Sequence, residues 1–464
     1  MENDRTPVDV GGLGRRSFLT RGALLAGGAA ALAPMAGIRP AGAVTNAAGA
    51  GNGGVAAAVV TTMTGAAIQT AINALPATGG AVQLVAGTYT VGKPINLRTG
   101  CVLVGAGRGA TVLQLTSGTN TTVLRNVDTV NGNPGVAVLD LTIDGNRAHQ
   151  GNRGSSQGIE LHRCANFVLE NLEVMGCDGT GIIVSGNGTP TRVGSVVNVF
   201  SHDNAVHGIW ITYATREVSY AAVTCDLNGQ DGLVIDHSEA IANGLHCSRN
   251  GRDGVRVTNV IANNLVGILA DLNGRNGIHV LGFVNSVGSA WAAHNNGLHE
   301  AAPDVYFDGT LNTYGATDHS IVQGIECGAA QKSTWGAGYP ATPTATETYG
   351  LTVDPTIQGN LTLLGVRNCG GSAGTYSIAP PGSTGSVVII DHAVGTNDLR
   401  LLWGDLRIAG GTLLHDSGGM LGFYGAAPTA QPTVSGDKTA DPTSVLTSLL
   451  GALSALGLVA DTTT

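Results

Sequence analysis

The chain of 464 residues is poor in charged and aromatic side chains. Only 12% of the residues are charged and 4% are aromatic, whereas 43% are apolar. Disordered chains combine low hydrophobicity with high net charge, so this composition excludes disorder. There are 23 basic residues against 32 acidic ones, and only three of the basic residues are Lys. A net charge of −9 gives no basic surplus for a nucleic-acid partner, and we expect none.

Several regular patterns are also missing. The Gly residues follow no three-residue period, which excludes a collagen triple helix. No segment after the N-terminal region has the roughly 18–20 consecutive apolar residues of a membrane span. The seven Cys show no paired C-x-x-C spacing of a zinc site. Cys225 and Cys247 occupy equivalent repeat positions, and we expect stacked, buried thiols there rather than a disulfide.

The N-terminal region has the pattern of an export signal. Arg15-Arg16 precedes Phe18, an apolar stretch rich in Ala and Leu, and the small-residue site Ala41-Gly42-Ala43. This order resembles a twin-arginine signal peptide. We therefore expect a signal over residues 1–43, a secreted protein with no membrane contact after cleavage, and a flexible Ala/Gly-rich lead over residues 44–63.

Gly is abundant, with 71 residues, and much of it recurs with a period. A Gly followed by alternating apolar residues returns at intervals near 23 residues, at Gly158, Gly181, Gly208, Gly232, Gly254, Gly277 and Gly297. Such a period, with short β-branched strands, is typical of one coil of a solenoid. Each coil then contains two or three short strands that pair with their copies in the coils above and below.

Two residue types have defined roles in this repeat. Gly is expected to supply turns of positive φ in each coil, where it meets no steric penalty. An Asn stands four residues before the repeat Gly in four coils, as Asn204, Asn228, Asn250 and Asn273. We predict that these Asn form an internal ladder of stacked amides.

Helices are expected at both ends of the solenoid. Residues 67–75 place Ile68, Ile72 and Leu75 on one helical face, which suits a cap over the first coil. A second, Leu-rich helix is expected over residues 443–458.

The ends of the solenoid set the expected divisions of the chain. We divide it into a β-helix with its cap (64–330), an irregular continuation (331–420) and a C-terminal tail (421–464). The tail contains the phrase Leu421-Gly-Phe-Tyr-Gly-Ala-Ala-Pro-Thr-Ala-Gln-Pro-Thr433, followed by the Leu-rich helix. In this it resembles the tails of phage fibre proteins, which implies an assembly element forming a homotrimer. The alternative is a cap that packs on its own β-helix.

The cap, the repeats and the phrase Leu141-Thr-Ile-Asp-Gly-Asn146 together resemble the pectate-lyase-like superfamily. This resemblance implies an all-β, right-handed parallel β-helix with coils of about 23 residues, an N-terminal capping helix and a short C-terminal helix. The phrase is most similar to mannuronan C5-epimerases. Their catalytic Asp-Pro-His-Glu quartet is absent, because the strand one coil later reads Gly181-Ile-Ile-Val-Ser185. Epimerase residues are therefore not assigned.

Polar and aromatic side chains are expected to form a ladder on one outer face. Offsets +1 and +3 after each repeat Gly face inward, so offsets +2 and +4 face outward. Coils lie about 4.8 Å apart, so side chains of neighbouring coils can contact one sugar ring. The predicted catalytic residues are Asp236, His237, Arg256 and His279. The predicted substrate-binding residues are Arg147, His149, Glu160, His162, Trp210 and Tyr213.

These residue types suit uronate chemistry. β-Elimination requires a group that neutralises the substrate carboxylate, a base at C5 and a proton donor. Arg256 with His237, His279 and Tyr213 supplies these types, and Ca²⁺ could serve as the neutralising group. The pattern requires no other cofactor, and no residue is assigned as a metal ligand. Hydrolysis instead requires two carboxylates flanking the bond, and Asp236 lies on the ladder.

The sequence thus predicts a secreted β-helix enzyme that acts on a polysaccharide. A lyase that cleaves a uronate-containing polymer ranks first. The alternatives are a glycoside hydrolase on the same fold and a non-catalytic, trimeric, glycan-binding or fibre-like surface protein.

Overall fold

The computed structural model describes the chain from residue 57 onward, with gaps. The described residues are 57–151, 154, 156–186, 191–212, 214–237, 239–258, 260–308, 319–328, 348–354, 359–368, 374–378, 385–392, 399–403, 420–421, 429–430, 435 and 441–455. The chain divides into two units, 1–54 and 55–464, and every described residue belongs to the second. The expected signal lies outside the described residues.

Two parallel sheets form the body of this unit. The long-strand sheet contains β1 (Ala57–Val60), β2 (Gly80–Leu84), β3 (Gly87–Val91), β5 (Cys101–Val104), β6 (Thr111–Leu115), β8 (Ala137–Asp144), β10 (Phe167–Met175), β12 (Thr191–His202), β14 (Thr215–Asp226), β16 (Ile241–Ser248), β19 (Asn264–Asp271), β22 (Val287–His294), β24 (His319–Gly328), β26 (Gly359–Asn368), β28 (Gly385–His392) and β29 (Leu399–Trp403). The short-strand sheet contains β4 (Ile95–Leu97), β7 (Leu124–Asn126), β9 (Ile159–His162), β11 (Ile182–Ser185), β13 (Ile209–Ile211), β15 (Leu233–Ile235), β17 (Val255–Val257), β20 (Ile278–Val280), β23 (Val305–Phe307), β25 (Tyr349–Val353) and β27 (Gly374–Ile378). Two small pairs complete the set: β18 (Val260–Ile261) with β21 (Phe283–Val284), and β30 (Met420–Leu421) with β31 (Thr429–Ala430).

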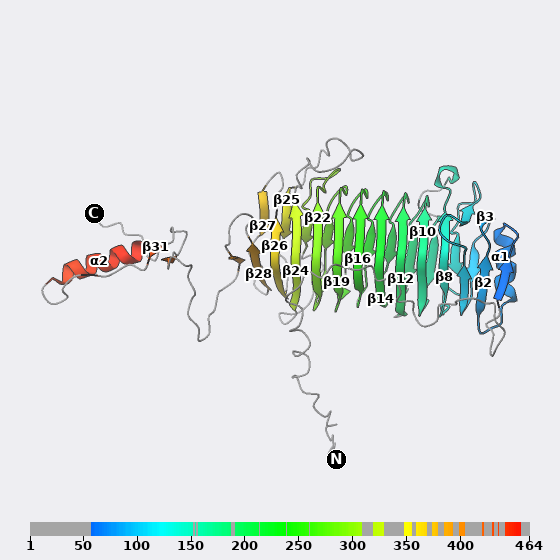
Figure 1. The fold of residues 1–464 in the computed structure, drawn as a ribbon, viewed down its shortest axis with the longest axis horizontal. Coiled ribbons are helices and arrows are strands. Elements are labelled where there is room, and N and C mark those ends of the chain that lie inside the picture. Colours follow the sequence, from blue (N-terminus) through cyan, green and yellow to red (C-terminus); the bar gives the residue numbers. More distant parts are fainter. Residues whose placement is uncertain are drawn as a thin grey trace, which may run out of the picture. The chain divides into compact units, whose positions relative to one another are not determined.

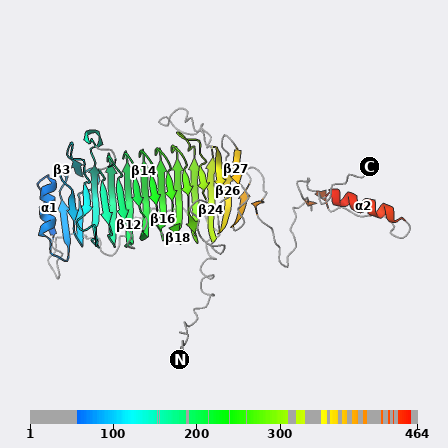
Figure 2. The ribbon, with the colours of Figure 1, turned by 180° about the vertical axis from the view of Figure 1, so that it is seen from behind.

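From β8 onward the chain alternates between the two sheets, so one long and one short strand make each coil. Figures 1 and 2 show the long strands stacked side by side in chain order. From β8 to β26 each long strand contains a residue of positive φ, such as Asn171 (φ 53°) and Asn198 (φ 50°), at which the strand bends around the core. The inward residues form one continuous apolar core from Val60 to Val366. The predicted parallel β-helix is confirmed.

A short helix lies at the N-terminal end of the stack. Helix α1 (Gly65–Ala74) begins after Thr64, whose hydroxyl accepts a hydrogen bond from the Ala67 amide at 3.2 Å. Ile68 and Ile72 on its inner face are fully buried. The preceding strand β1 pairs in parallel with β2, so the expected flexible lead is wrong for its last residues.

The C-terminal third is more regular than expected. Strands β25 to β28 continue the parallel pairing of both sheets beyond the expected boundary at residue 330, and β29 then pairs antiparallel with β28. Helix α2 (Pro442–Ala455) begins one residue before the range expected for a helix and ends three residues before that range does. Among the described residues, no helix is both long and apolar enough to cross a membrane.

The predicted Asn ladder is confirmed inside the turns that lead from the long to the short strands. The Nδ2 atom of each Asn donates to the Oδ1 atom of the next at 2.9–3.0 Å, from Asn204 through Asn228, Asn250 and Asn273 to Asn296. Every member is at most 2% exposed. The backbone amide of each Asn donates to the same neighbouring oxygen, so the ladder fixes the register of successive turns.

The repeat glycines serve a different purpose from the expected one. None of those before the short strands β9 to β20 has a positive φ. A Cβ atom at Gly208 would lie 2.6 Å from the Gly232 carbonyl oxygen and 2.8 Å from Asn228 Nδ2. The glycine is therefore required because the Asn ladder and the next coil leave no space for a side chain. Positive φ is adopted instead by other residues of the coils, both glycines such as Gly244 (φ 76°) and residues with side chains such as Leu227 (φ 53°). The expectation that Gly supplies positive φ therefore holds for glycines outside the repeat position.

The coils continue, but the glycine at the repeat position ends at Gly277, one position earlier than the sequence pattern indicates. Gly297 is not followed by a short strand, and β23 begins at Val305, in register with Ile278 of β20. Asp304 takes the place of the repeat Gly and accepts a hydrogen bond from Asn296 Nδ2 through Oδ1, at 2.6 Å. A carboxylate therefore ends the ladder of amides.

The cysteines are buried thiols, as predicted. Cys225 and Cys247 are register partners on β14 and β16, and all six described cysteines are free. Burial raises the pKa of Cys101 and Cys164 to about 11, so their thiols stay protonated and unreactive.

Removing one rung of the ladder is expected to destabilise the fold strongly. Asn250→Ala removes the hydrogen bonds of the Asn250 side chain. It leaves their partners on Asn228, on Asn273 and at the Cys225 carbonyl unpaired. Each buried polar group left without a partner costs about 1–3 kcal/mol, so we expect a loss of at least about 2 kcal/mol in chemical denaturation. Asn243→Ala, at an exposed position on β16, is the matched control and should change little. Equal effects of the two changes would contradict a structural role of the ladder.

Candidate functional site

The outward side chains of the short-strand sheet form a row in strict register. Strand pairing places the following residues at successive steps of this row: Arg125, Glu160, Ile183, Trp210, Val234, Arg256, His279 and Tyr306. The predicted ladder is confirmed, and Tyr306 extends it by one coil. Val234 is buried (5% exposed) and separates Trp210 from the charged part of the row.

Arg256 stands on β17 above a buried acid. Its Nη1 lies 3.8 Å from Oδ2 of Asp231, which is fully buried. Arg252 approaches the other oxygen of Asp231 at 3.7 Å. The Nε of Arg256 is buried and has no hydrogen-bond partner among the described residues. The guanidinium is thus held by one long ion pair and keeps donors for another anion.

His279 on the next strand joins two carboxylates. Its Nδ1 lies 2.9 Å from Asp253 Oδ2 and its Nε2 lies 3.3 Å from Asp308 Oδ2. The ring stacks on Tyr306, with the centroids 5.1 Å apart, and is 6% exposed. Asp308 has a 13% exposed side chain, so it forms the outer end of an Asp253–His279–Asp308 chain. A proton can be held on either ring nitrogen and moved between the inner and the outer carboxylate.

Electrostatics keep the inner carboxylate ionised. Burial alone would raise the pKa of Asp253, but hydrogen bonds from Arg275 and His279, together with their charges, outweigh it and lower that pKa well below its usual range. The same bond to Asp253 raises the pKa of Arg275.

Tyr306 is held in its protonated form. Burial, with the charges of Asp308 and Asp354, raises the pKa of Tyr306 to about 12. Its hydroxyl donates to Asp354 Oδ2 at 3.1 Å. The phenol is therefore a proton donor at neutral pH.

Trp210 stands in the middle of the row, between Ile183 and Val234. Its ring meets the edge of His207 with the centroids 5.5 Å apart. Burial lowers the pKa of His207, although Asp231 at 3.4 Å opposes this shift.

The prediction that His237 is a catalytic residue on this outer face is wrong. His237 is 1% exposed, and its Nε2 lies 2.7 Å from the hydroxyl of the buried Tyr220. The in–out alternation continues one residue beyond β15, so Asp236 faces outward and His237 faces inward. Asp236 is half-buried and accepts a hydrogen bond from the Thr258 hydroxyl at 2.7 Å, one coil away.

The predicted substrate-binding residues do not all meet. Glu160 and His162 on β9 pair with each other at 2.9 Å, and this hydrogen bond is the main reason why the pKa of Glu160 is lowered. Arg147 and His149 belong to the short 3-10 helix Arg147–His149, in the turn after β8. Tyr213 lies outside the described residues.

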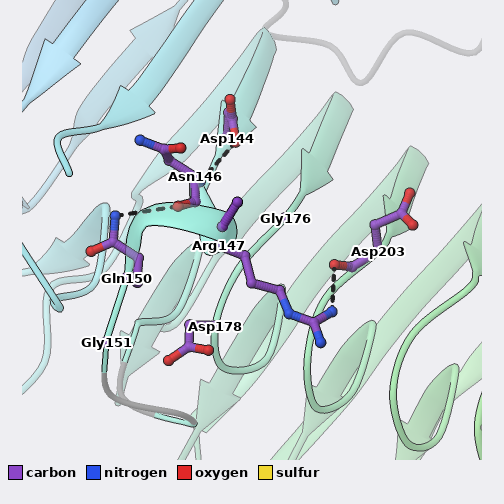
Figure 3. A pocket seen from close by; sticks show the side chains of 9 residues that line it. Asp144, Asn146, Arg147, Gln150, Gly151, Gly176, Asp178 and Asp203 are labelled. Carbon is purple, nitrogen blue, oxygen red and sulfur yellow. Dashed lines mark hydrogen bonds between the residues drawn. The ribbon is translucent and has the colours of Figure 1, made fainter. Parts of the chain in front are cut away.

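Arg147 lines a separate polar pocket with a volume of about 590 Å³. The pocket lies on the turns that follow β8, β10 and β12, and its carboxylates come from Asp144, Asp178 and Asp203. Figure 3 shows Arg147 extending from its loop toward Asp203. Within the described part of the chain, no group of three or more His, Cys, Asp or Glu side chains lies close enough to hold a metal ion. A role for Ca²⁺ therefore stays a prediction without an assigned site.

Sequence reasoning missed Asp253, Tyr306, Asp308 and Asp354. Tyr306 and Asp308 follow Asp304 rather than a repeat Gly, so the Gly pattern gave no sign of their strand. Asp253 immediately precedes Gly254 and was indistinguishable from a turn residue. The usable signal was the alternation in Val305-Tyr-Phe-Asp308, which repeats the apolar–polar order of Ile278-His-Val.

The comparisons with known proteins agree with the fold. A family model described as rhamnogalacturonase A/epimerase, pectate lyase-like, matches residues 60–267. Among solved structures, the A-module of the Azotobacter vinelandii mannuronan C-5 epimerase AlgE4 is 21% identical, with a TM-score of 0.50, over 69% of this chain and 95% of that chain. The A-module of AlgE6 from the same organism is 21% identical, with a TM-score of 0.49, over 70% of this chain and 94% of that one.

A tailspike is also similar. The protein gp49 of Acinetobacter baumannii bacteriophage Fri1, a capsular polysaccharide depolymerase, is 12% identical, with a TM-score of 0.39, over 72% of this chain and 62% of that chain. No curated protein sequence matches the chain. The chain therefore has the parallel β-helix fold, and the pectate-lyase-like family model matches the part of it from residue 60 to residue 267. At 21% identity, the likeness to the AlgE4 module concerns the fold alone.

The lowered pKa of Asp253 predicts a pH-dependent contribution to stability. The ionised carboxylate stabilises the fold above about pH 4, the pKa of an unfolded Asp, and this contribution is lost as the pH falls toward the lowered folded-state value. Asp253→Asn should lower the melting temperature near neutral pH, and its difference from the wild type should shrink below about pH 4.

An exposed ion pair provides the control for this measurement. Glu217 pairs with Arg192 at 3.3 Å, and both side chains are well exposed. Glu217→Gln should leave the melting temperature nearly unchanged at each pH, because surface pairs contribute little. A deficit of Asp253→Asn that stays constant into acid would contradict the assigned ion pairs.

Proposed function

We propose that the protein is a polysaccharide lyase that cleaves a uronate-containing polymer on the outer face of the short-strand sheet. The observation that carries this proposal is the register pair Arg256 and His279. The Arg256 guanidinium, which has spare donors, lies one strand away from the Asp253–His279–Asp308 chain, which can hold a proton. β-Elimination needs this pair of functions side by side, because the substrate carboxylate must be neutralised while the adjacent C5 proton leaves.

The row supplies each step of the reaction. Arg256 binds the uronate carboxylate and draws charge from it, which makes the C5–H bond more acidic. The Asp308–His279 pair accepts the C5 proton, while Asp253 fixes the imidazole from below. The bond from C4 to the glycosidic oxygen then breaks, a C4–C5 double bond forms, and the departing oxygen takes a proton from the Tyr306 hydroxyl. Protons and electrons balance without an oxidant or a reductant.

The second candidate is a glycoside hydrolase, and a different observation favours it. Asp308 and Asp354 occupy equivalent positions after β23 and β25, which are neighbouring strands. Strands lie about 4.8 Å apart, close to the roughly 5–5.5 Å that separates the carboxylates of retaining glycosidases. In this reaction Asp308 and Asp354 would flank the glycosidic bond as acid and nucleophile.

We also propose that the protein is exported through the twin-arginine signal over residues 1–43 and assembles as a homotrimer through its tail. Leu446 and Leu449 on α2 are 56% and 40% exposed, which supports an apolar face that meets another chain. The resulting molecule would be a secreted, trimeric enzyme. A non-catalytic fibre-like protein would share the assembly and lack the reaction.

The neutralising role of Arg256 can be tested by substitution. Arg256→Gln should lower kcat/KM on a polyuronate by about 10²–10³-fold, because an ionic contact that develops in the transition state is lost. The reaction is followed by the absorbance of the unsaturated product near 232 nm. Arg252→Gln is the matched control: it also faces Asp231, its side chain is 39% exposed, and it lies outside the row.

The products decide between the two reactions. New reducing ends without the absorbance of a double bond would overturn the lyase and support hydrolysis, and Asp354→Asn should then abolish the activity. Binding of glycans without any product on a panel of polyuronates and neutral polysaccharides would overturn both enzymatic functions.

The assembly can be tested by light scattering. Introducing two charges, Leu446→Asp with Leu449→Asp, should convert a trimeric mass to a monomeric one, because the apolar contact becomes a cluster of like charges. Thr447→Asp, an exposed site on the same helix, should leave the mass unchanged. A wild-type chain that runs as a monomer would overturn the proposed trimer.

A further inference from the structure

The pocket around Arg147 lies on a different face from the row of Arg256 and His279. Its walls come from the loop after β8 and from the turns after β10 and β12, and no residue of the short strands lines it. Its volume of about 590 Å³ is in the range of small-molecule sites, about 300–1,000 Å³. The lining residues include Asp144, Asn146, Arg147, Gln150, Asp178 and Asp203.

Asp178 provides an acceptor that the protein does not use. This residue is 4% exposed, and its Oδ2 is buried without a hydrogen-bond partner among the described residues. Buried carboxylates without partners are costly, so natural structures retain them mainly where they have a function. The carboxylate lines the pocket, where a ligand that donates a hydrogen bond would satisfy it.

Arg147 provides donors that the protein uses poorly. The one hydrogen bond of its guanidinium to a described residue is a long one of 3.4 Å, from Nη1 to the Asp203 carbonyl oxygen, and it forms no ion pair with the described residues. Figure 3 shows this bond across the pocket. Arg147 is exposed and a guanidinium carries five N–H donors, so most of these donors are open to solvent or to a ligand in the pocket.

The other two carboxylates depend less on a ligand. Asp144 accepts from Gln114 Nε2 and from the Asn146 amide, each at 2.7 Å. Asp203 Oδ2 lies 2.6 Å from His202 Nδ1, and the Asp203 side chain is 56% exposed, so water can satisfy its other oxygen. Both add negative charge to the pocket. Asp178, whose Oδ2 is buried without a partner among the described residues, is therefore the carboxylate that gains most from a ligand, beside Arg147.

The pairing of these two groups selects the ligand. A metal cation would satisfy Asp178 and leave Arg147 unpaired, and an anion such as phosphate would do the reverse. A hydroxyl group donates one hydrogen bond and accepts another, so neighbouring hydroxyls of a sugar can satisfy both side chains at once. Among the described lining residues, three carboxylates stand against one guanidinium, so their combined charge disfavours a uronate.

We propose that this pocket binds a neutral sugar residue through adjacent hydroxyl groups that donate to Asp178 and accept from Arg147. The site goes beyond the proposed elimination and uses none of its residues, so either can fail alone. If the protein has both the elimination site and this sugar-binding pocket, the substrate is a heteropolysaccharide in which uronate and neutral sugars occur together.

Ligand-detected NMR on the full chain tests this site. The probes are the methyl glycosides of glucose, galactose and mannose, each beside the matching uronate glycoside. We expect at least one neutral glycoside to bind and its uronate counterpart to bind more weakly. Asp178→Asn and Arg147→Gln should each weaken that binding by about tenfold or more, because each removes a hydrogen bond to a charged group.

Three controls make the result decisive. Glu217→Gln and Arg192→Gln alter an acid and a base outside the pocket, and Arg256→Gln alters the row; all three should keep the binding. Asp178→Asn should melt no lower than the wild type, because the buried Oδ2 atom that it replaces has no hydrogen-bond partner among the described residues.

Four results would overturn the proposal. The first is that no neutral glycoside binds, and the second is that Asp178→Asn and Arg147→Gln bind the glycoside as well as the wild type does. The third is a lowered melting temperature of Asp178→Asn, and the fourth is binding of Ca²⁺ or inorganic phosphate instead of the sugar.

Discussion

The structure depends on the in-register pairing of each coil with the next. Parallel strands about 4.8 Å apart repeat one chain path, and the buried amide ladder from Asn204 to Asn296 holds the turns at the same step. A substitution in one coil therefore acts on its neighbours, because the side chain of one Asn completes the hydrogen bonds of another. The same constraint explains Gly208 and its equivalents, where the carbonyl of the next coil leaves no space for a Cβ atom.

This register also determines what the surface can do. Equivalent residues of successive coils are neighbours, because the coils stack in register. Their side chains therefore form rows along the surface. Under the row of the short-strand sheet lie two fully buried acids, Asp231 and Asp253. Burial of a carboxylate is costly unless it is paired, and the cationic and imidazole groups above supply the partners. The buried acids thus fix Arg256 and His279 in position, and the proposed reaction uses the outward sides of these groups.

Much of the architecture could be predicted from the sequence, because the repeat places Gly, Asn and apolar residues at fixed intervals. The Asn ladder, the stacked cysteines and the outward row including Arg256 and His279 follow from that periodicity and from strand alternation. The role of the glycines did not follow, because steric contact with the next coil has no signature in a single strand. The position of His237 depended on how far the alternation continues beyond β15. Asp253 and Asp308 were missed because their importance comes from contacts across coils 26 and 29 residues apart in sequence.

The central claim is that Arg256 receives a substrate carboxylate beside the Asp253–His279–Asp308 chain. A crystal structure of Asp308→Asn, with its proton acceptor removed, in complex with an oligouronate tests this claim most directly. The account predicts a uronate carboxylate against the Arg256 guanidinium, with C5 of the same ring facing residue 308 and the His279 ring. An oligosaccharide bound elsewhere, or bound with its carboxylates directed away from Arg256, would contradict the account.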